Sequence, residues 1–274
     1  MQLGIFAKTF AGSTPVEVLN AAKAAGYRCV QYNMACSGLS ALPAYISHET
    51  ASDVAEAATQ TSVQIAAVSA TYNMTHPDMT LRVQGREAFT QIAKNAHAMG
   101  TNLLTVCTGS CDAADQWRHH PDNDSEAAWR EMSAEFEHLI AIADTFDIYV
   151  GIEPELANVV SSAAKARRLI DQFASKRLKI ILDPANLFEV ETPQSRHAII
   201  EAAIDLLSGS IVMAHAKDRD ANGGFTTAGT GVIDFAHFIG CLQRAGFDGA
   251  LVTHGLSATQ APQVSAYLTN LLSL

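Results

Sequence analysis

Short apolar runs alternate with longer amphipathic segments along the whole chain, and this alternation limits the fold more than any other feature. The apolar runs are nearly continuous, which is typical of parallel strands that are buried on both faces. We expect strands over residues 3–8, 27–33, 63–70, 101–108, 148–154, 178–184, 211–217 and 249–254. Eight strand–helix units in succession favour a closed (β/α)₈ barrel, also called a TIM barrel, over a doubly wound sheet of the same α/β class.

Helix-start signals fall between these runs. Thr14-Pro15 followed by Glu17 combines an N-cap, a proline at the first helical position and a capping-box acid. Asn123 with Glu126 predicts a second capping box. The chain has 274 residues, close to the roughly 250 that one such barrel needs. Because no linker or composition break interrupts the pattern, we expect a single domain over residues 1–274.

Charge and composition restrict the partners and the compartment. The 18 basic residues are outnumbered by 28 acidic ones, which argues against nucleic acid as a partner. We find neither a signal-like leader nor an apolar window of about 18 residues, so we expect no membrane span and a cytoplasmic protein. The five cysteines show no CxxC spacing, which fits a reducing compartment rather than a disulfide framework. The sequence leaves open whether the chain forms a homo-oligomer.

Ligand-type side chains end four successive expected strands. Glu153 and Glu155 close the fifth strand, Asp183 the sixth, His215 the seventh and His254 the eighth. In a barrel these strand ends converge around one axis. We therefore expect one divalent metal ion, Mn²⁺, Co²⁺, Zn²⁺, Fe²⁺ or Mg²⁺, among Glu153, Asp183, His215 and His254. Individually, these residues also allow ordinary structural explanations, such as a turn cap at Asp183 or a solvated loop carboxylate at Glu155.

Several further polar residues occur at the same end of the expected barrel. Lys217, His76 and Trp117 are candidates for substrate contact, and His76 could instead be a ligand or an ordinary loop residue. The polar segment 109–125 and the glycine-rich segment 221–231 follow strands and should cover the site. The glycines of 229–231 could offer backbone N–H groups to a phosphate, although a flexible loop explains them equally well.

The motifs at these strand ends resemble those of a known superfamily. They are GIEPE at 151–155, ILDPAN at 181–186, AHAKD at 214–218, GTGVIDF at 229–235 and GFDGALVTH at 246–254. In order and spacing they are similar to the sugar phosphate isomerase/epimerase superfamily, whose members have a xylose isomerase-like TIM barrel. The segments 73–78 and 108–129 look like one branch of that superfamily. The resemblance spans essentially the whole chain.

The resemblance implies roles for individual residues. Ketose 3-epimerases of this superfamily bind one divalent metal through Glu, Asp, His and Glu, and their two glutamates exchange protons with the sugar. Glu153, Asp183 and His215 match the first three ligands, whereas His254 stands where the pattern has the second glutamate. Asn186 stands where those epimerases have a substrate-contacting histidine. A histidine can still ligate a metal or act as an acid or base near neutral pH.

Together these observations predict a metal-dependent isomerase or epimerase. Its substrate would be a small carbohydrate-like molecule: a sugar, a sugar phosphate or a polyol-derived carbonyl compound. Proton transfer by Glu153 and His254 would pass through a metal-stabilised enediolate. A lyase or dehydratase that uses the same metal, and a non-catalytic sugar-binding barrel, remain alternatives. An apurinic-site endonuclease shares the barrel but needs several metals and a basic DNA-binding face, which the net charge of −10 disfavours.

Overall fold

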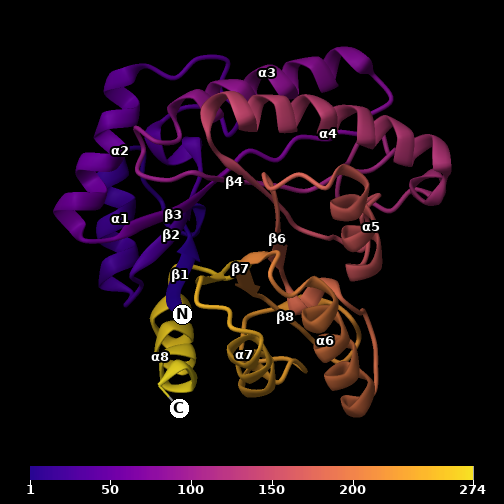
Figure 1. Ribbon diagram of the computed structural model, residues 1–274. Coiled ribbons are helices and arrows are strands. Elements are labelled where there is room, and N and C mark those ends of the chain that lie inside the picture. The colour runs from indigo at the N-terminus through magenta and orange to yellow at the C-terminus, as the bar shows by residue number, and fades with distance from the viewer. Residues whose placement is uncertain (274) are drawn as a thin grey trace.

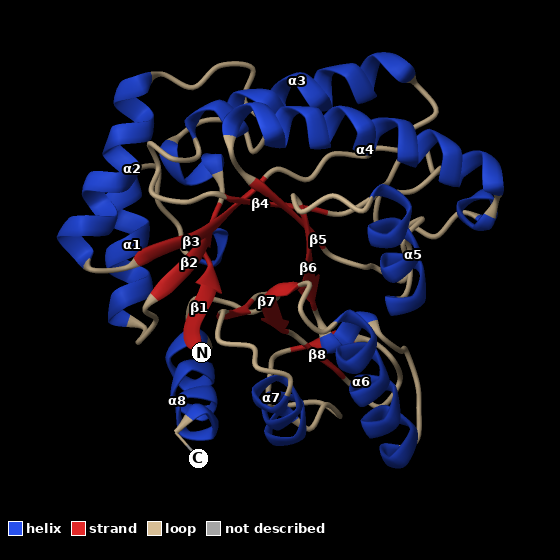
Figure 2. Ribbon diagram, in the orientation of Figure 1, coloured by secondary structure: helices blue, strands red, loops and turns tan. Residues whose placement is uncertain are grey.

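A closed parallel barrel surrounded by helices forms the body of the molecule (Figures 1 and 2). The computed structural model describes residues 1–273, so Leu274 lies outside the described residues. Around the barrel the strands follow the order β1-β10-β7-β6-β5-β4-β3-β2. They are β1 (Gln2–Phe6), β2 (Cys29–Tyr32), β3 (Gln64–Ser69), β4 (Leu103–Val106), β5 (Tyr149–Ile152), β6 (Leu178–Leu182), β7 (Ile211–Ala216) and β10 (Ala250–Thr253).

The helices form a ring outside the strands, and one long helix follows each barrel strand (Figure 2). They are α1 (Pro15–Ala24), α2 (His48–Thr61), α3 (Met79–Asn95), α4 (Glu126–Phe146), α5 (Ala163–Phe173), α6 (Pro193–Leu207), α7 (Phe235–Arg244) and α8 (Ala261–Leu272). A short antiparallel pair, β8 (Asp218–Arg219) with β9 (Phe225–Thr226), lies in the loop after β7. The (β/α)₈ fold predicted from the sequence is thus confirmed within residues 1–273.

Each expected strand range overlaps a barrel strand, but the observed strands are shorter, and β1 begins one residue earlier than expected. Several strands turn at once into 3₁₀ helices, as at Ala7–Thr9 after β1 and Pro184–Asn186 after β6. These turns end the ladder hydrogen bonds while the chain is still rich in apolar residues. Apolar patterning marks burial rather than pairing, so it extended the predicted strands beyond their true ends.

The capping signals were right at one helix and wrong at another. Glu17 Oε2 accepts hydrogen bonds from the N–H groups of Ser13 and Thr14 at 3.2 Å, as a capping-box acid should. The second box was wrong: Ser125, not Asn123, caps α4, and its Oγ accepts from Ala128 N at 3.1 Å. Asn123 is buried instead and ties the loop after β4 to the loop after β5, because its Nδ2 donates to Ala157 O.

An apolar layer fills the inside of the barrel. Ala67, Leu103, Ile181, Met213 and Val252 form a cluster separate from the larger core between strands and helices. Side chains alternate across a strand, so the residue two positions further along also points inward. Two positions beyond four of these apolar residues stand Thr105, Asp183, His215 and His254. A polar layer therefore lies on an apolar floor at the C-terminal end of the barrel.

The buried carboxylate of Asp218 organises the glycine-rich loop after β7. Its Oδ1 accepts from the N–H groups of Arg219 at 2.8 Å and Ile233 at 3.0 Å. Its Oδ2 accepts from Gly229 at 3.0 Å and Gly231 at 2.9 Å. The glycines are needed here because a Cβ on Gly231 would clash with Arg219 O and the Asp218 carboxylate. The N–H groups of Gly229 and Gly231, which the sequence suggested for a phosphate, therefore bind a carboxylate of the chain itself.

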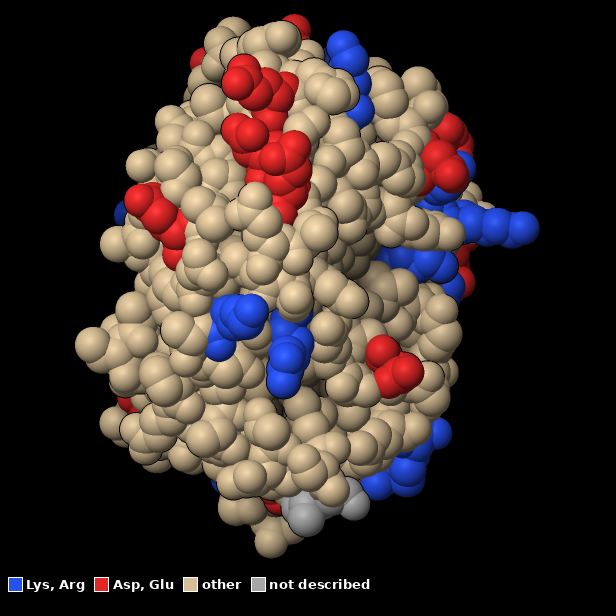
Figure 3. Space-filling model, turned by 90° about the vertical axis from the view of Figure 1, so that its left-hand side faces the viewer, with Lys and Arg blue, Asp and Glu red and all other residues tan. Residues whose placement is uncertain are grey.

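Figure 3 shows the side of the molecule on which α1 and α2 lie. Lysine and arginine residues occur there in small separate groups, and acidic residues form one larger group and several smaller ones. This face therefore offers no continuous basic surface of the kind that a phosphate backbone requires. Within residues 1–273, no helix combines the length and the apolar character needed to cross a membrane.

Replacing Asp218 by asparagine should destabilise the protein. One of its two oxygens would become an NH₂ group facing two N–H donors, and each buried donor left without an acceptor costs about 1–3 kcal/mol. We expect the free energy of unfolding, measured with urea, to fall by about 2–5 kcal/mol. The matched control is Asp53→Asn on the exposed side of α2, which should stay within about 0.5 kcal/mol of the parent. Equal stabilities of the two variants would contradict this role of Asp218.

Candidate functional site

Four ligand-type side chains meet above the apolar floor. Glu153 follows β5, Asp183 follows β6, His215 lies in β7 and His254 follows β10. These strands are neighbours in the barrel, so residues more than 100 positions apart come together. One ligand atom from each residue lies within 4.8 Å of the ligand atoms of the other three. The structure thus brings together all four residues that the sequence suggested as metal ligands.

The contacts within this cluster have the spacing of a metal coordination sphere. Glu153 Oε1 lies 2.9 Å from His215 Nδ1, and Asp183 Oδ2 lies 3.2 Å from His254 Nε2. Metal–ligand bonds of about 2.0–2.2 Å place neighbouring ligand atoms about 3.0–3.6 Å apart. Two carboxylates and two imidazoles also match the ligands that Mn²⁺, Fe²⁺, Co²⁺ and Zn²⁺ accept. The residues present therefore fit a divalent ion.

The two carboxylate oxygens of Asp183 contact different groups. Its Oδ1 accepts from Ala185 N at 2.9 Å and caps the 3₁₀ helix Pro184–Asn186. Its Oδ2 faces His254. The turn-capping explanation and the ligand explanation thus apply to different oxygens of one carboxylate, and the cap fixes the direction in which the second oxygen points.

His215 is held from both sides of its ring. Nδ1 faces Glu153, and Nε2 lies 2.7 Å from Gln31 Oε1 in β2. Gln31 is itself fixed, because its Nε2 donates to Thr105 Oγ1 in β4 at 3.0 Å. A ligating histidine commonly donates its second ring N–H to such an acceptor, which orients the ring. Gln31 and Thr105 were not predicted as site residues from the sequence, although each is a polar residue within an otherwise apolar strand.

Burial and charge act against each other at these groups. Burial would raise the pKa of Glu153, but the adjacent charge and hydrogen bond of His215 outweigh it and lower that pKa. Burial likewise opposes the charge on His215, yet Glu153 raises the histidine pKa above its usual value. For His254, burial and the positive charge of His215 lower the pKa. Glu153 is therefore held as the carboxylate, and His254 as the neutral imidazole, that metal ligation requires.

Asn186 reaches the same cluster. It is buried, and its Nδ2 donates to Glu153 Oε1 at 3.1 Å. Its Oδ1 is buried without any hydrogen-bond partner among the described residues. A buried polar atom without a partner is rare in native structures and points to a group that binds there. The substrate contact that the resemblance implies for Asn186 stays a prediction.

Two adjoining cavities open above the cluster. The inner cavity, of about 240 Å³, is lined by Phe6, Gln31, Ser69, Thr71, Thr105, Cys107, Trp117, Glu153, Glu155, His215, Lys217 and His254. The outer cavity, of about 570 Å³, is lined by Trp117, His119, Glu155, Leu156, Ala157, Glu189, Lys217, Arg219, Gly223, Gly224 and Phe225. Residues of both long loops thus lie on the side of the cluster, as expected from the order of strands. Trp117, Glu155 and Lys217 line both cavities.

Lys217 and Glu155 bring charge to the junction of the two cavities. Lys217 Nζ lies 3.2 Å from the centre of the Phe225 ring, a cation–π contact within the loop after β7. Burial and the charge of Glu153 raise the pKa of Glu155 to about 7. The sequence analysis noted Glu155 but did not place it in the site. The sequence signal for Glu155 was its position two residues after Glu153, another carboxylate at the end of the same strand.

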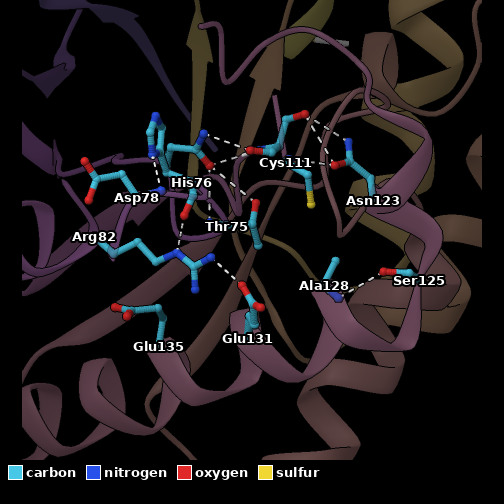
Figure 4. Close-up of polar contacts among 12 residues, drawn as sticks. Thr75, His76, Asp78, Arg82, Cys111, Asn123, Ser125, Ala128, Glu131 and Glu135 are labelled. Atoms are coloured by element: carbon cyan, nitrogen blue, oxygen red, sulfur yellow. Dashed lines mark hydrogen bonds and ion pairs between the residues drawn. The ribbon is translucent and has the colours of Figure 1, made fainter. Parts of the chain in front are cut away.

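His76 occupies a different environment from the other candidates. Its Nε2 lies 3.0 Å from Ala113 O, and its Nδ1 accepts from Asp78 N at 3.0 Å (Figure 4). Arg82 bonds His76 O and Glu131 and so connects this loop to α4. His76 lines a cavity of about 450 Å³ beside the loop after β4, which shares Thr71 with the inner cavity, but His76 is not among the residues that line the inner cavity. The structure does not bring His76 into the four-residue cluster.

A family profile described as "Xylose isomerase-like TIM barrel" matches residues 19–270, which is most of the chain. The chain belongs to this family. The resemblance stated from the strand-end motifs is thereby confirmed. No curated protein matches the sequence significantly.

Solved structures of sugar epimerases share the fold. An apo 3-keto-D-glucoside 4-epimerase from E. coli superposes with a TM-score of 0.79 at 16% identity, covering 98% of this chain and 99% of that one. An L-ribulose 3-epimerase gives 0.77 at 16% identity, with coverages of 99% and 94%. A D-psicose 3-epimerase gives 0.73 at 13% identity, with coverages of 100% and 97%. At these identities the likeness establishes the barrel architecture alone.

Removing the support of His215 should weaken metal binding. Gln31→Leu takes away the acceptor for Nε2, and loss of such an orienting partner typically lowers metal affinity about 10- to 100-fold. The measurement is a titration with Mn²⁺, followed by its electron paramagnetic resonance signal. Asp183→Asn should reduce binding further, since it removes a ligand. Gln64→Leu, an exposed glutamine in β3, is the matched control and should bind like the parent. Unchanged Mn²⁺ affinity in Gln31→Leu would show that Gln31 does not support the cluster.

Proposed function

We propose that this protein is a metal-dependent isomerase or epimerase of a small sugar or related hydroxy-carbonyl compound. The observation that carries this proposal is the cluster of Glu153, Asp183, His215 and His254 over an apolar floor. A family whose fold is shared by sugar epimerases supports the same reading. Active sites of such barrels lie at the C-terminal ends of the strands, where this cluster stands.

A divalent ion bound by the four residues would supply Lewis-acid stabilisation of negative charge on substrate oxygens. Glu153 is the residue we assign to proton transfer at the carbon beside the carbonyl. Its carboxylate takes that proton, and the electron pair left on carbon moves to the carbonyl oxygen to give an enediolate. Return of a proton to the opposite face of the same carbon gives the epimer, and return to the neighbouring carbon gives the isomer.

His254 is the residue we assign as the partner acid or base. It is held 3.2 Å from Asp183 Oδ2, and its ring centre lies 4.5 Å from that of His215. A neutral histidine can ligate a metal through one ring nitrogen, or it can take up a proton there as a base and return that proton from the imidazolium as an acid. His254 can thus replace the second glutamate of the epimerase pattern in either of its tasks.

We infer an unphosphorylated substrate from the contacts that the amide and basic groups near the cavities already make. The amides of Gly229 and Gly231 are bound to Asp218, so they cannot cradle a phosphate. Arg219 donates to Ala185 O and Gly223 O, and Lys217 lies over Phe225. The two basic side chains are thus engaged by the chain itself. We place the reacting sugar in the inner cavity and any further part of the substrate in the outer cavity, beside the indole of Trp117.

Glu153→Gln should abolish the exchange of substrate hydrogen with solvent. The amide cannot accept the proton, and loss of a general base costs about 10²- to 10⁴-fold in rate. The measurement is deuterium incorporation from D₂O into a panel of ketoses, aldoses and 3-keto glycosides, with divalent metal present. Glu137→Gln on the exposed face of α4 is the control. Sugar binding without exchange in the parent protein would favour the non-catalytic sugar-binding barrel. Product with a new double bond would favour the lyase or dehydratase.

Substitution of His254 separates a ligand from an ordinary strand-end residue. His254→Ala should lower Mn²⁺ affinity or turnover by about 10- to 100-fold, by analogy with lost ligand support. His254→Glu restores the carboxylate of the epimerase pattern and should retain the metal. His138→Ala, on the exposed face of α4, is the control for loss of a histidine. If His254→Ala binds metal and turns over substrate like the parent, His254 has neither task.

A further inference from the structure

A second cluster of ligand-type side chains lies in the outer helical layer, between α6 and α7. Glu201 of α6, with His237 and Cys241 of α7, brings three different ligand types within 4.8 Å of one another. Residues four positions apart share a helix face, so His237 and Cys241 stand one above the other on α7. His197 and Glu201 stand in the same relation on α6. Each of two adjacent helices thus presents a pair of ligand-type residues.

The distances in this cluster are compatible with coordination of a metal ion. His237 Nε2 lies 3.4 Å from Glu201 Oε1 and 3.5 Å from Cys241 Sγ. The first distance is long for an N–H···O hydrogen bond, which usually measures 2.7–3.2 Å, whereas the second also fits a hydrogen bond that involves sulfur. Around tetrahedral Zn²⁺, bonds of about 2.0–2.1 Å to N and O and about 2.3 Å to S separate N from O by about 3.4 Å and N from S by about 3.5 Å. Both measured separations match these edges.

The surroundings support a cation at this point. A cavity of about 440 Å³ is lined by Glu201, Asp205, Ser208, Cys241, Arg244 and Ala245, so a second carboxylate lies at hand. His197 stacks on the ring of His237 with a centroid distance of 4.0 Å, and its Nε2 lies 3.2 Å from Asp234 Oδ2. The stacked ring limits the rotation of His237. Arg244 Nη2 donates to Cys241 Sγ at 3.0 Å and opposes the burial that raises the pKa of this thiol.

We propose that Glu201, His237 and Cys241 form a second metal site that binds one Zn²⁺ or Co²⁺ ion. Water would complete a tetrahedral coordination sphere. The thiolate and the carboxylate together balance the two charges of the ion. The mixed sulfur, nitrogen and oxygen ligands select softer ions than the oxygen and nitrogen set in the barrel does. The bound ion fastens α6 to α7 and stabilises the folded chain.

Cobalt spectroscopy on the full chain tests this site without any assay of activity. All measurements use the Asp183→Asn protein as the background, because its barrel cluster has lost one ligand. The result therefore does not depend on the proposed enzyme function. After chelation of all metals, titration with Co²⁺ should produce a thiolate-to-cobalt charge-transfer absorption that saturates at one ion per chain. Addition of Zn²⁺ should abolish that absorption and raise the melting temperature.

Four further substitutions in the Asp183→Asn background identify the cysteine that supplies the sulfur ligand. Cys241→Ser should remove the charge-transfer absorption, and Glu201→Gln, at an exposed position, should weaken Co²⁺ binding by about 10-fold or more. Cys111→Ser is the matched control and should leave both unchanged. Cys107→Ser is needed because Cys107 Sγ lies 3.7 Å from Glu153 Oε2 in the barrel cluster. The proposal is overturned if the Asp183→Asn protein shows no charge-transfer absorption with Co²⁺. It is also overturned if the absorption survives Cys241→Ser or disappears with Cys107→Ser.

Discussion

The apolar layer inside the barrel is the constraint on which the rest of the molecule depends. Leu103, Ile181, Met213 and Val252 fill the space between the strands and exclude water from below. Because side chains alternate along a strand, filling this layer forces the residues two positions further on to face the axis as well. Those positions hold three of the four ligand-type side chains, Asp183, His215 and His254, whereas Glu153 stands two positions beyond Gly151. The packing that stabilises the barrel therefore also sets the direction and height of the functional cluster.

Placing charged groups on such a floor requires that each one be paired. Burial penalises the ionised forms of Glu153 and His215, and their contact at 2.9 Å compensates for that penalty. Gln31 satisfies the other nitrogen of His215. One carboxylate oxygen of Asp183 accepts a hydrogen bond from its own turn, and the other contacts His254. Hydrogen bonds thus organise the cluster, which limits the rearrangement that binding would require.

Sequence patterns predicted the barrel and the four clustered residues because both follow from local rules. Buried parallel strands leave nearly continuous apolar runs, and a polar residue at the end of such a run must lie at the C-terminal side. The same reasoning failed for Asn123, where the spacing to Glu126 suggested a cap that Ser125 provides. It also could not place His76, whose loop turns it towards Ala113 rather than towards the axis. Loop conformation depends on contacts that no periodicity encodes.

The amino-acid sequence by itself determined the order of strands and helices, the α/β class and the set of ligand-type residues at strand ends. Tertiary structure decided which of these residues touch. The link from Gln31 to His215 spans 184 positions and depends on the closure of the barrel. The capture of the Gly229 and Gly231 amides by Asp218, and the approach of Glu201 to His237, depend likewise on how loops and helices settle against the strands. Such contacts are fixed by three-dimensional packing, because distances between segments remote in sequence leave no local pattern.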